Sequence, residues 1–185
     1  TALINEEVAY LKAVADGERP SRADRSPLEG LTPLPTVDLP VSALIPEHYV
    51  SDAAQRLFYY KEMMSSRTSA ELDAALAELV DRYGHTPDEV QSAFRVMRLR
   101  MRADDFGIEK IDGKGGRLSV VFREDADLSP RFFSLLTRMN RECYLSRTHF
   151  IWPFTGSPLP ACETMLTAME GARAEIEEQR QELGV

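Results

Sequence analysis

The sequence has few of the residues from which catalytic and metal centres are built. Its 185 residues include three histidines and two cysteines, and none of them stands at the close spacing of a zinc site or an HExxH motif. The GxxxxGKS/T phosphate loop and the GxSxG nucleophile elbow are missing as well. We therefore expect a domain that is not an enzyme by itself and that binds no cofactor and no metal.

Long apolar runs are also missing. No stretch approaches the ~20 apolar residues of a membrane-spanning helix, and the chain shows no apolar secretory leader. Cys143 and Cys162 lack the CxxC spacing, so two reduced thiols are expected rather than a disulfide framework. These features predict a cytoplasmic protein without a membrane partner.

Basic residues are in the minority, because 22 lysines and arginines face 30 acidic residues and give a net charge of −8. Phosphate neutralisation supplies most of the affinity of a DNA-binding domain, so this balance disfavours DNA as the main partner and suits a basic surface. The strongest basic cluster, FRVMRLRMR at 94–102, would place Arg95, Arg98 and Arg102 on one helical face. A nucleic-acid-contacting domain that uses this face is an alternative. Four arginines without stacking aromatics favour instead a solvated face that pairs with acidic neighbours.

The first forty residues differ in composition from the rest. Apolar residues at helical spacing predict an amphipathic helix over 3–16, and the sequence enters it at once, as a fragment of a larger protein would. A proline-rich stretch then predicts an extended linker. The predicted organisation is a linking helix over 1–17, an extended linker over 18–35 and a single domain over 36–185.

Helical and strand patterns alternate through that domain. Val37–Leu39 predicts a short edge strand, because the neighbouring Pro40 cannot donate to a sheet interior. Period-two patterning predicts a hairpin around the GKGG turn at 113–116, and one more strand over 143–152. The fold class is therefore α+β, with about five to six helices and a small, mostly antiparallel sheet. The helices are expected at 52–64, 69–83, 86–106, 129–139 and from 159 onward.

Two of these helices differ in their predicted burial. The helix after Asp52 has almost no polar face, which is typical of a helix buried at the centre of its domain. Its apolar residues are Leu57, Phe58, Tyr59, Tyr60, Met63 and Met64. The next helix carries one apolar stripe, made of Leu72, Leu76, Leu79, Val80 and Tyr83.

The other side of the 69–83 helix is charged. Glu71, Glu78, Asp81 and Arg82 are expected to lie opposite the apolar stripe. Glu78 and Asp81 lie three residues apart and so project together as one acidic patch. The core does not need them, and most such patches only keep a surface soluble.

Four ordered elements resemble the C-terminal domain of bacterial transcription-repair coupling factor. They are the aspartate–hydrophobic start at Val37–Leu39, an IPxxYVxD element at Ile45–Asp52, RLxxYK at Arg56–Lys61, and ELVDRYGxxP at Glu78–Pro87. The string VMRLRMRADDFGIEKID at 96–112 is similar to the helix and GIxKI strand that follow in the family. The resemblance extends from about Glu6 to Phe122.

The resemblance implies a function that the residues alone do not. The parent protein would be an ATP-driven DNA translocase that displaces stalled RNA polymerase and recruits nucleotide excision repair through UvrA. The helicase motifs would lie upstream of this chain, so RNA polymerase and DNA would be partners only through the parent protein. In the family this domain packs on the UvrB-like domain of the same polypeptide and masks the UvrA-binding surface. Glu78 and Asp81 match the acidic pair that faces that domain, and Arg82 and Glu71 complete the expected partner-binding set.

A third hypothesis is an unrecognised enzyme. Cys143 and His149 could form a thiolate–imidazolium pair after folding. A half-buried thiol beside a surface imidazole is the expected arrangement instead.

Overall fold

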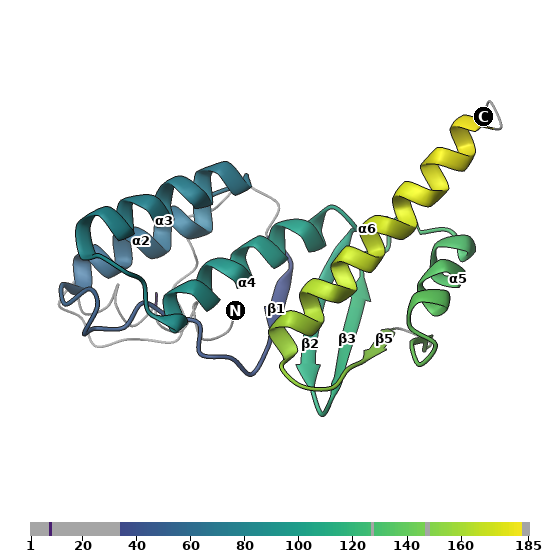
Figure 1. The fold of residues 1–185 in the computed structure, drawn as a ribbon, viewed down its shortest axis with the longest axis horizontal. Helices are drawn as coiled ribbons and strands as arrows, with labels where there is room; N and C mark the ends of the chain where they lie inside the picture. The colour runs from purple at the N-terminus through teal and green to yellow at the C-terminus, as the bar shows by residue number, and fades with distance from the viewer. Residues whose placement is uncertain (1–7, 9–33, 127, 147–148, 183–185) are drawn as a thin grey trace. The chain divides into compact units, whose positions relative to one another are not determined.

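The computed structural model describes residues 8, 34–126, 128–146 and 149–182. Within these residues the chain forms five helices and one five-stranded sheet (Figure 1). Three of the four strand pairings are antiparallel, so the predicted α+β class with a mostly antiparallel sheet is confirmed. The helix expected at 3–16 and nearly all of the predicted linker lie outside the described residues.

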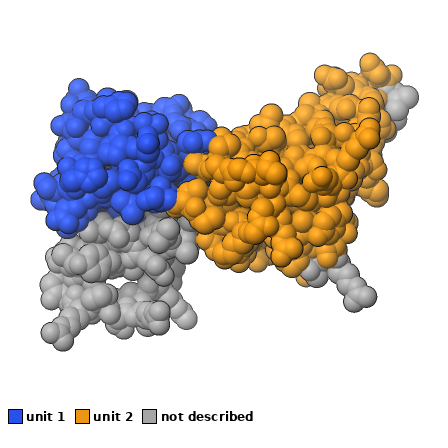
Figure 2. Space-filling view, turned by 60° about the horizontal axis from the view of Figure 1, so that its bottom comes forward, with its two compact units in different colours: residues 1–34, 42–101 blue, residues 35–41, 102–185 orange. Residues whose placement is uncertain are grey.

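The chain divides into two compact units, coloured separately in Figure 2. Unit 1 takes residues 1–34 and 42–101, and unit 2 takes residues 35–41 and 102–185. Unit 2 is thus assembled from two separate stretches of sequence. The domain boundaries expected from the sequence stay predictions.

Unit 1 is helical. It contains α2 (Ala53–Ser65), α3 (Ser69–Tyr83) and most of α4 (Asp88–Asp104). The Asp52 side chain accepts a hydrogen bond from the Gln55 amide and begins α2 as predicted. Gly84, at φ +80°, ends α3 as predicted, with its amide donating to the Val80 carbonyl over 2.9 Å.

The prediction that α2 is buried nearly all round is wrong. Phe58 is 43% exposed, whereas Arg56 is only 7% exposed. The Arg56 guanidinium donates to the carbonyl oxygens of Val50 (2.6 Å) and Ser51 (2.9 Å). These bonds compensate the cost of burying the charge. Arg56 is therefore buried on α2, whereas the hydrophobic pattern predicted that Phe58 would be buried.

The predicted stripe on α3 is only partly correct. Leu72 and Leu79 are fully buried, but Val80 is 43% exposed. α4 begins at Asp88, two residues after the expected start at Thr86, and the Val90 and Gln91 amides donate to the Pro87 carbonyl. The large, fully buried side chains of unit 1 are Ile45, Tyr59, Tyr60, Met63, Leu72, Leu79, Phe94, Met97 and Leu99.

Two buried tyrosines of α2 allow a stability test. The Ile45 amide donates to the Tyr60 hydroxyl over 2.7 Å in the interior, whereas the buried Tyr59 hydroxyl has no partner within the described residues. Tyr60→Phe should lower the free energy of unfolding by about 1–3 kcal/mol, because it leaves a buried amide without this acceptor. Tyr59→Phe should be close to neutral. Urea denaturation measures both, and an equal loss in the two variants would contradict this account.

Unit 2 holds the sheet. Its strands are β1 (Thr36–Asp38), β2 (Ile108–Lys114), β3 (Arg117–Phe122), β4 (Tyr144–Leu145) and β5 (Phe150–Pro153), in the order β1-β2-β3-β5-β4. β1 lies at one edge and runs parallel to β2, so the predicted edge strand is confirmed with a shift of one residue. Gly115 and Gly116, at φ +60° and +72°, make the two-residue turn between β2 and β3. The GKGG string is therefore a hairpin turn, as predicted.

Residues 143–152 differ from the prediction. They include two antiparallel strands, β4 and most of β5, and beside the last pair of this ladder the Ser146 amide donates to the His149 carbonyl over 2.7 Å. Neither glycine nor proline stands between the two strands, so the usual sequence signal of a turn was lacking.

Two helices complete unit 2. α5 (Pro130–Met139) begins at Ser129, whose hydroxyl accepts from the Phe132 amide, and α6 (Pro158–Glu182) lies across β3 (Figure 1). The buried side of α6 consists of Leu159, Cys162, Met165, Leu166, Met169 and Ala172. None of the helices in the described part of the chain is both long and apolar enough to cross a membrane.

Candidate partner-binding surface

The predicted partner-binding residues near the end of α3 lie at the surface of unit 1. The Arg82 guanidinium lies 2.9 Å from the Glu78 carboxylate, and their side chains are 54% and 42% exposed. Asp81 is exposed beside them. We call Glu78, Asp81 and Arg82 the α3 surface. Its charged groups remain within reach of a partner.

Glu71, two turns earlier, has a structural role. Its carboxylate accepts hydrogen bonds from the amides of Arg67 (2.6 Å) and Thr68 (3.2 Å), while the Thr68 hydroxyl accepts from the Glu71 amide. These amide donors lower the pKa of Glu71. The arrangement is a capping box that begins α3.

The prediction that all four charged residues lie opposite the core needs correction. Glu78 lies at the flank of α3, where it lines a groove together with Glu62 and Ser65 of α2. Asp81 is more exposed than Glu78. Helical spacing correctly predicted that Asp81 is exposed. It could not predict that α2 packs beside Glu78.

Aromatic residues pack at the C-terminal end of α3, next to the α3 surface. The Tyr49 hydroxyl donates to the carbonyls of Gly84 (2.9 Å) and Leu79 (3.3 Å) and so fixes the end of the helix. The Tyr83 ring packs against Tyr49 at 5.8 Å and Tyr59 at 6.1 Å between centroids. Burial raises the pKa of Tyr49, so this hydroxyl remains a donor at neutral pH. The helical and strand patterns gave no signal for Tyr49, although it stands in the IPxxYVxD element.

Two of the arginines at 94–102, Arg98 and Arg102, pair with acidic neighbours. Arg98 pairs with Asp73 of α3 in unit 1. In unit 2, Arg102 makes a two-point contact with Glu170 at 2.7 and 2.9 Å and donates to the Thr167 hydroxyl. The excess of acidic residues predicted such pairing with acidic neighbours rather than a face that contacts nucleic acid.

Arg100 is buried instead of surface-exposed. Its guanidinium donates to the Leu34 carbonyl over 3.3 Å. Burial, with the nearby positive charge of Arg67, lowers the pKa of Arg100 to about 10, so the group stays charged at neutral pH. It belongs to the interior of unit 1 and adds nothing to a basic face.

The geometry of Cys143 and His149 does not form a catalytic pair. In the antiparallel ladder Tyr144 pairs with Ile151 and Leu145 with Phe150. Cys143 immediately precedes β4 and His149 immediately precedes β5, so they stand at opposite ends of this ladder, roughly 10 Å apart along the strands at about 3.3 Å per residue. Burial raises the pKa of the Cys143 thiol, which disfavours the thiolate that a nucleophile requires.

Thiol reactivity tests this point. Cys143 and Cys162 are buried, and burial raises the pKa of Cys162 to about 12. Both should react slowly with iodoacetamide at pH 7.5 in the native protein and quickly in denaturant. Because the folded-state pKa of Cys162 exceeds its ordinary value of 9.0, stability should be unaffected below pH 9 and should fall as pH rises from there toward 12. A fast native reaction that Cys143→Ala abolishes would support the enzyme hypothesis.

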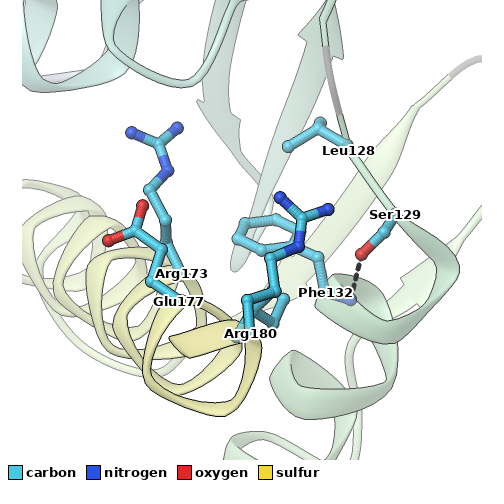
Figure 3. A pocket seen from close by; sticks show the side chains of 7 residues that line it. Leu128, Ser129, Phe132, Arg173, Glu177 and Arg180 are labelled. Atoms are coloured by element: carbon cyan, nitrogen blue, oxygen red, sulfur yellow. Dashed lines mark hydrogen bonds between the residues drawn. The ribbon is translucent and has the colours of Figure 1, made fainter. Parts of the chain in front are cut away.

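A small cavity lies between α5 and α6 in unit 2 (Figure 3). Its volume is about 130 Å³, the space of a few water molecules. Arg173 on its wall is held in place, since it donates to the Asp105 carbonyl over 2.7 Å and lies 3.9 Å from the centroid of the Phe106 ring. Glu177 and Arg180 add opposite charges, so this lining selects no ligand class. Among the described residues, no group of three or more histidines, cysteines or carboxylates could hold a metal ion.

Comparison with known proteins agrees with this fold. The family model for the TRCF domain matches residues 39–132. The transcription-repair-coupling factor of Escherichia coli (strain K12) is 32% identical over 139 residues, which are 73% of this chain and 12% of that protein. The Haemophilus influenzae protein of the same name is 31% identical over 132 residues, or 70% of this chain and 11% of that protein. The chain therefore spans about a tenth of the length of these relatives.

A solved structure supports the same assignment at the level of the fold. A crystal structure of the C-terminal domain of transcription-repair coupling factor superposes with a TM-score of 0.66 at 18% identity, covering 80% of this chain and 96% of that one. The described residues thus define an α+β domain with five helices and one five-stranded, mostly antiparallel sheet. The chain belongs to the TRCF domain family.

Proposed function

We propose that this chain is a non-catalytic regulatory domain of a transcription-repair coupling factor. The parent protein is then an ATP-dependent DNA translocase that displaces stalled RNA polymerase and recruits nucleotide excision repair. The domain packs on the UvrB-like domain of the same polypeptide and masks the surface that UvrA binds. The TRCF match over 39–132 supports the family part of this proposal.

The α3 surface is the observation that supports the proposed masking of the UvrA-binding surface. Leu72 and Leu79 anchor one side of α3 in the core, and Tyr49 fixes its end. The backbone of α3 from which Glu78, Asp81 and Arg82 project is therefore anchored on both counts. A preorganised backbone loses less entropy on binding, and carboxylates on a chain of net charge −8 suit a basic partner.

The direct test is binding in trans. The purified chain and the isolated UvrB-like domain of its parent should form a one-to-one complex in calorimetry. Added salt should weaken the complex, because screening reduces the attraction of exposed charges. Addition of the chain should also reduce UvrA capture by the UvrB-like domain. A complex that leaves UvrA capture unchanged would rule out masking, and the lack of any complex would rule out the proposed packing.

A further inference from the structure

One edge of the sheet in unit 2 is open. β4 is the last strand in the order β1-β2-β3-β5-β4, and among the described residues it pairs with β5 alone. Both of its side chains are exposed, Tyr144 to 51% and Leu145 to 60%. Met139, which ends the preceding helix α5, is 51% exposed. Three of the five large hydrophobic residues that are exposed in the described part of the chain therefore lie between residues 139 and 145.

The main chain of Leu145 faces away from the sheet. The Ser146 amide donates to the His149 carbonyl, and Tyr144 stands opposite Ile151. Hydrogen-bonded pairs alternate along an antiparallel ladder, so Tyr144 directs its N–H and C=O toward β5, whereas Leu145 directs both groups outward. Outside this ladder, Leu145 has no hydrogen-bond partner in the described residues. The edge therefore offers one main-chain donor and one main-chain acceptor.

The sequence of this edge does little to prevent pairing. Natural edge strands are commonly protected by their shortness, by lysine, by proline or by a bulge. β4 is short, but residues 143–146 are Cys-Tyr-Leu-Ser, with neither a charge nor a proline among them. Open main-chain groups beside exposed apolar side chains are what an added strand requires. The edge is thus suited to an extended segment.

The charge around β4 is opposite in sign to that of the whole chain. Residues 128–146 contain three arginines, Arg131, Arg138 and Arg141, and one acidic residue, Glu142, a net charge of +2 in a chain of net charge −8. All four side chains are exposed. An acidic segment is therefore favoured at this edge, and two copies of the edge would repel each other.

We infer that β4 accepts an extended, acidic segment of another protein as an additional strand. The main chain of the segment exchanges hydrogen bonds with Leu145, its apolar side chains contact Tyr144 and Leu145, and its carboxylates lie near Arg141. β4 belongs to unit 2, whereas the α3 surface belongs to unit 1. The inference therefore does not depend on the proposed function.

A pair of peptides tests the inference. Acetyl-Val-Glu-Val-Glu-Val-amide is titrated into the 15N-labelled full chain, and acetyl-Val-Lys-Val-Lys-Val-amide, of the same length and alternation, is the control. The acidic peptide should shift the amide signals of Tyr144, Leu145 and Ser146 and slow the exchange of the Leu145 amide with solvent. It should bind about tenfold more tightly than the basic peptide. No binding, equal binding of the two peptides, or shifts located elsewhere would overturn the inference.

Two proline variants test the direction of the main-chain groups. Leu145→Pro removes an outward N–H, a position at which edge strands tolerate proline, so thermal unfolding should hardly change while binding of the acidic peptide is lost. Tyr144→Pro removes an N–H that bonds to β5, so it should lower the unfolding temperature. If both variants unfold at the same lowered temperature, or if Leu145→Pro still binds the peptide, the inference is wrong.

Charge is tested separately, in variants that leave the backbone intact. Arg141→Gln should weaken binding of the acidic peptide about threefold, the effect of one exposed charge pair. Arg180→Gln removes an exposed arginine from α6 and should leave binding unchanged. Equal effects of the two substitutions would count against the location of the site at β4.

Sedimentation of the chain without peptide distinguishes another protein from a second copy. The chain should remain monomeric, because the arginines near β4 would face each other in a dimer paired through this edge. A dimer that Leu145→Pro abolishes would overturn the inference, since the edge would then be occupied by a second copy.

Discussion

Replacing Glu78 and Asp81 together with alanine should weaken the contact with the UvrB-like domain by about 2–5 kcal/mol, a typical cost when one partner of a buried charge pair is removed at an interface. The thermal stability of the isolated chain should hardly change. Glu78 pairs with the exposed Arg82 one turn later, and such pairs contribute only about 0.3–0.5 kcal/mol. Asp81 is exposed, where substitutions usually change stability by no more than about 0.5 kcal/mol. Calorimetric binding and thermal unfolding measure the two effects separately.

In the full-length parent protein, the same double substitution should raise UvrA binding and basal ATPase activity together. A matched control is Glu178→Ala with Glu182→Ala, which removes two exposed carboxylates from α6 in unit 2. The control should change neither activity. If the Glu78/Asp81 variant unfolds far below the unmodified chain, its carboxylates are structural. If it unfolds normally while UvrA binding stays low, masking depends on another surface.

Phe94→Ala should lower the free energy of unfolding by about 3–5 kcal/mol. The Phe94 side chain, on α4, is completely buried in unit 1, so its removal leaves a cavity that the surrounding helices cannot fill. Because a domain of this kind is stable by only about 5–15 kcal/mol, the loss should be obvious in guanidinium denaturation.

Phe58→Ala is the matched control. Phe58 is exposed on one side and touches Tyr59 with ring centroids 5.3 Å apart, so the loss should stay near 1 kcal/mol. The hydrophobic patterns of α2 and α4 predict similar, large losses for Phe58 and Phe94. A large loss at Phe58 would therefore support the pattern against the structure.

The order of elements could be predicted because its signals are local. Asp52, Gly84 and Ser129 mark helix ends through hydrogen bonds or backbone angles within a few residues. The Gly115–Gly116 turn is equally local. The parallel pairing of β1 with β2 joins residues more than seventy positions apart, and no local signal encodes it.

Those features of the α3 surface that depend on α3 alone could be predicted from the sequence. Asp81 follows from helical spacing, whereas the flank position of Glu78 depends on the packing of α2 beside α3. The structural role of Glu71 could have been recognised, because Thr68 and Glu71 form the S/T-x-x-E pattern of a capping box. The buried position of Arg56 could not, since charged residues are seldom buried and its carbonyl acceptors belong to the preceding loop.

The interleaving of the two units constrains how this chain can fold and be divided. β1 leaves the ribosome first, but its partner β2 follows only after residues 42–101 have been made. Closing that long loop costs conformational entropy, and prior folding of unit 1 would reduce the length of chain still free to move. A single cut after Val41 would separate β1 from the rest of its sheet and expose the edge of β2. Unit 2 therefore cannot be excised as one continuous fragment.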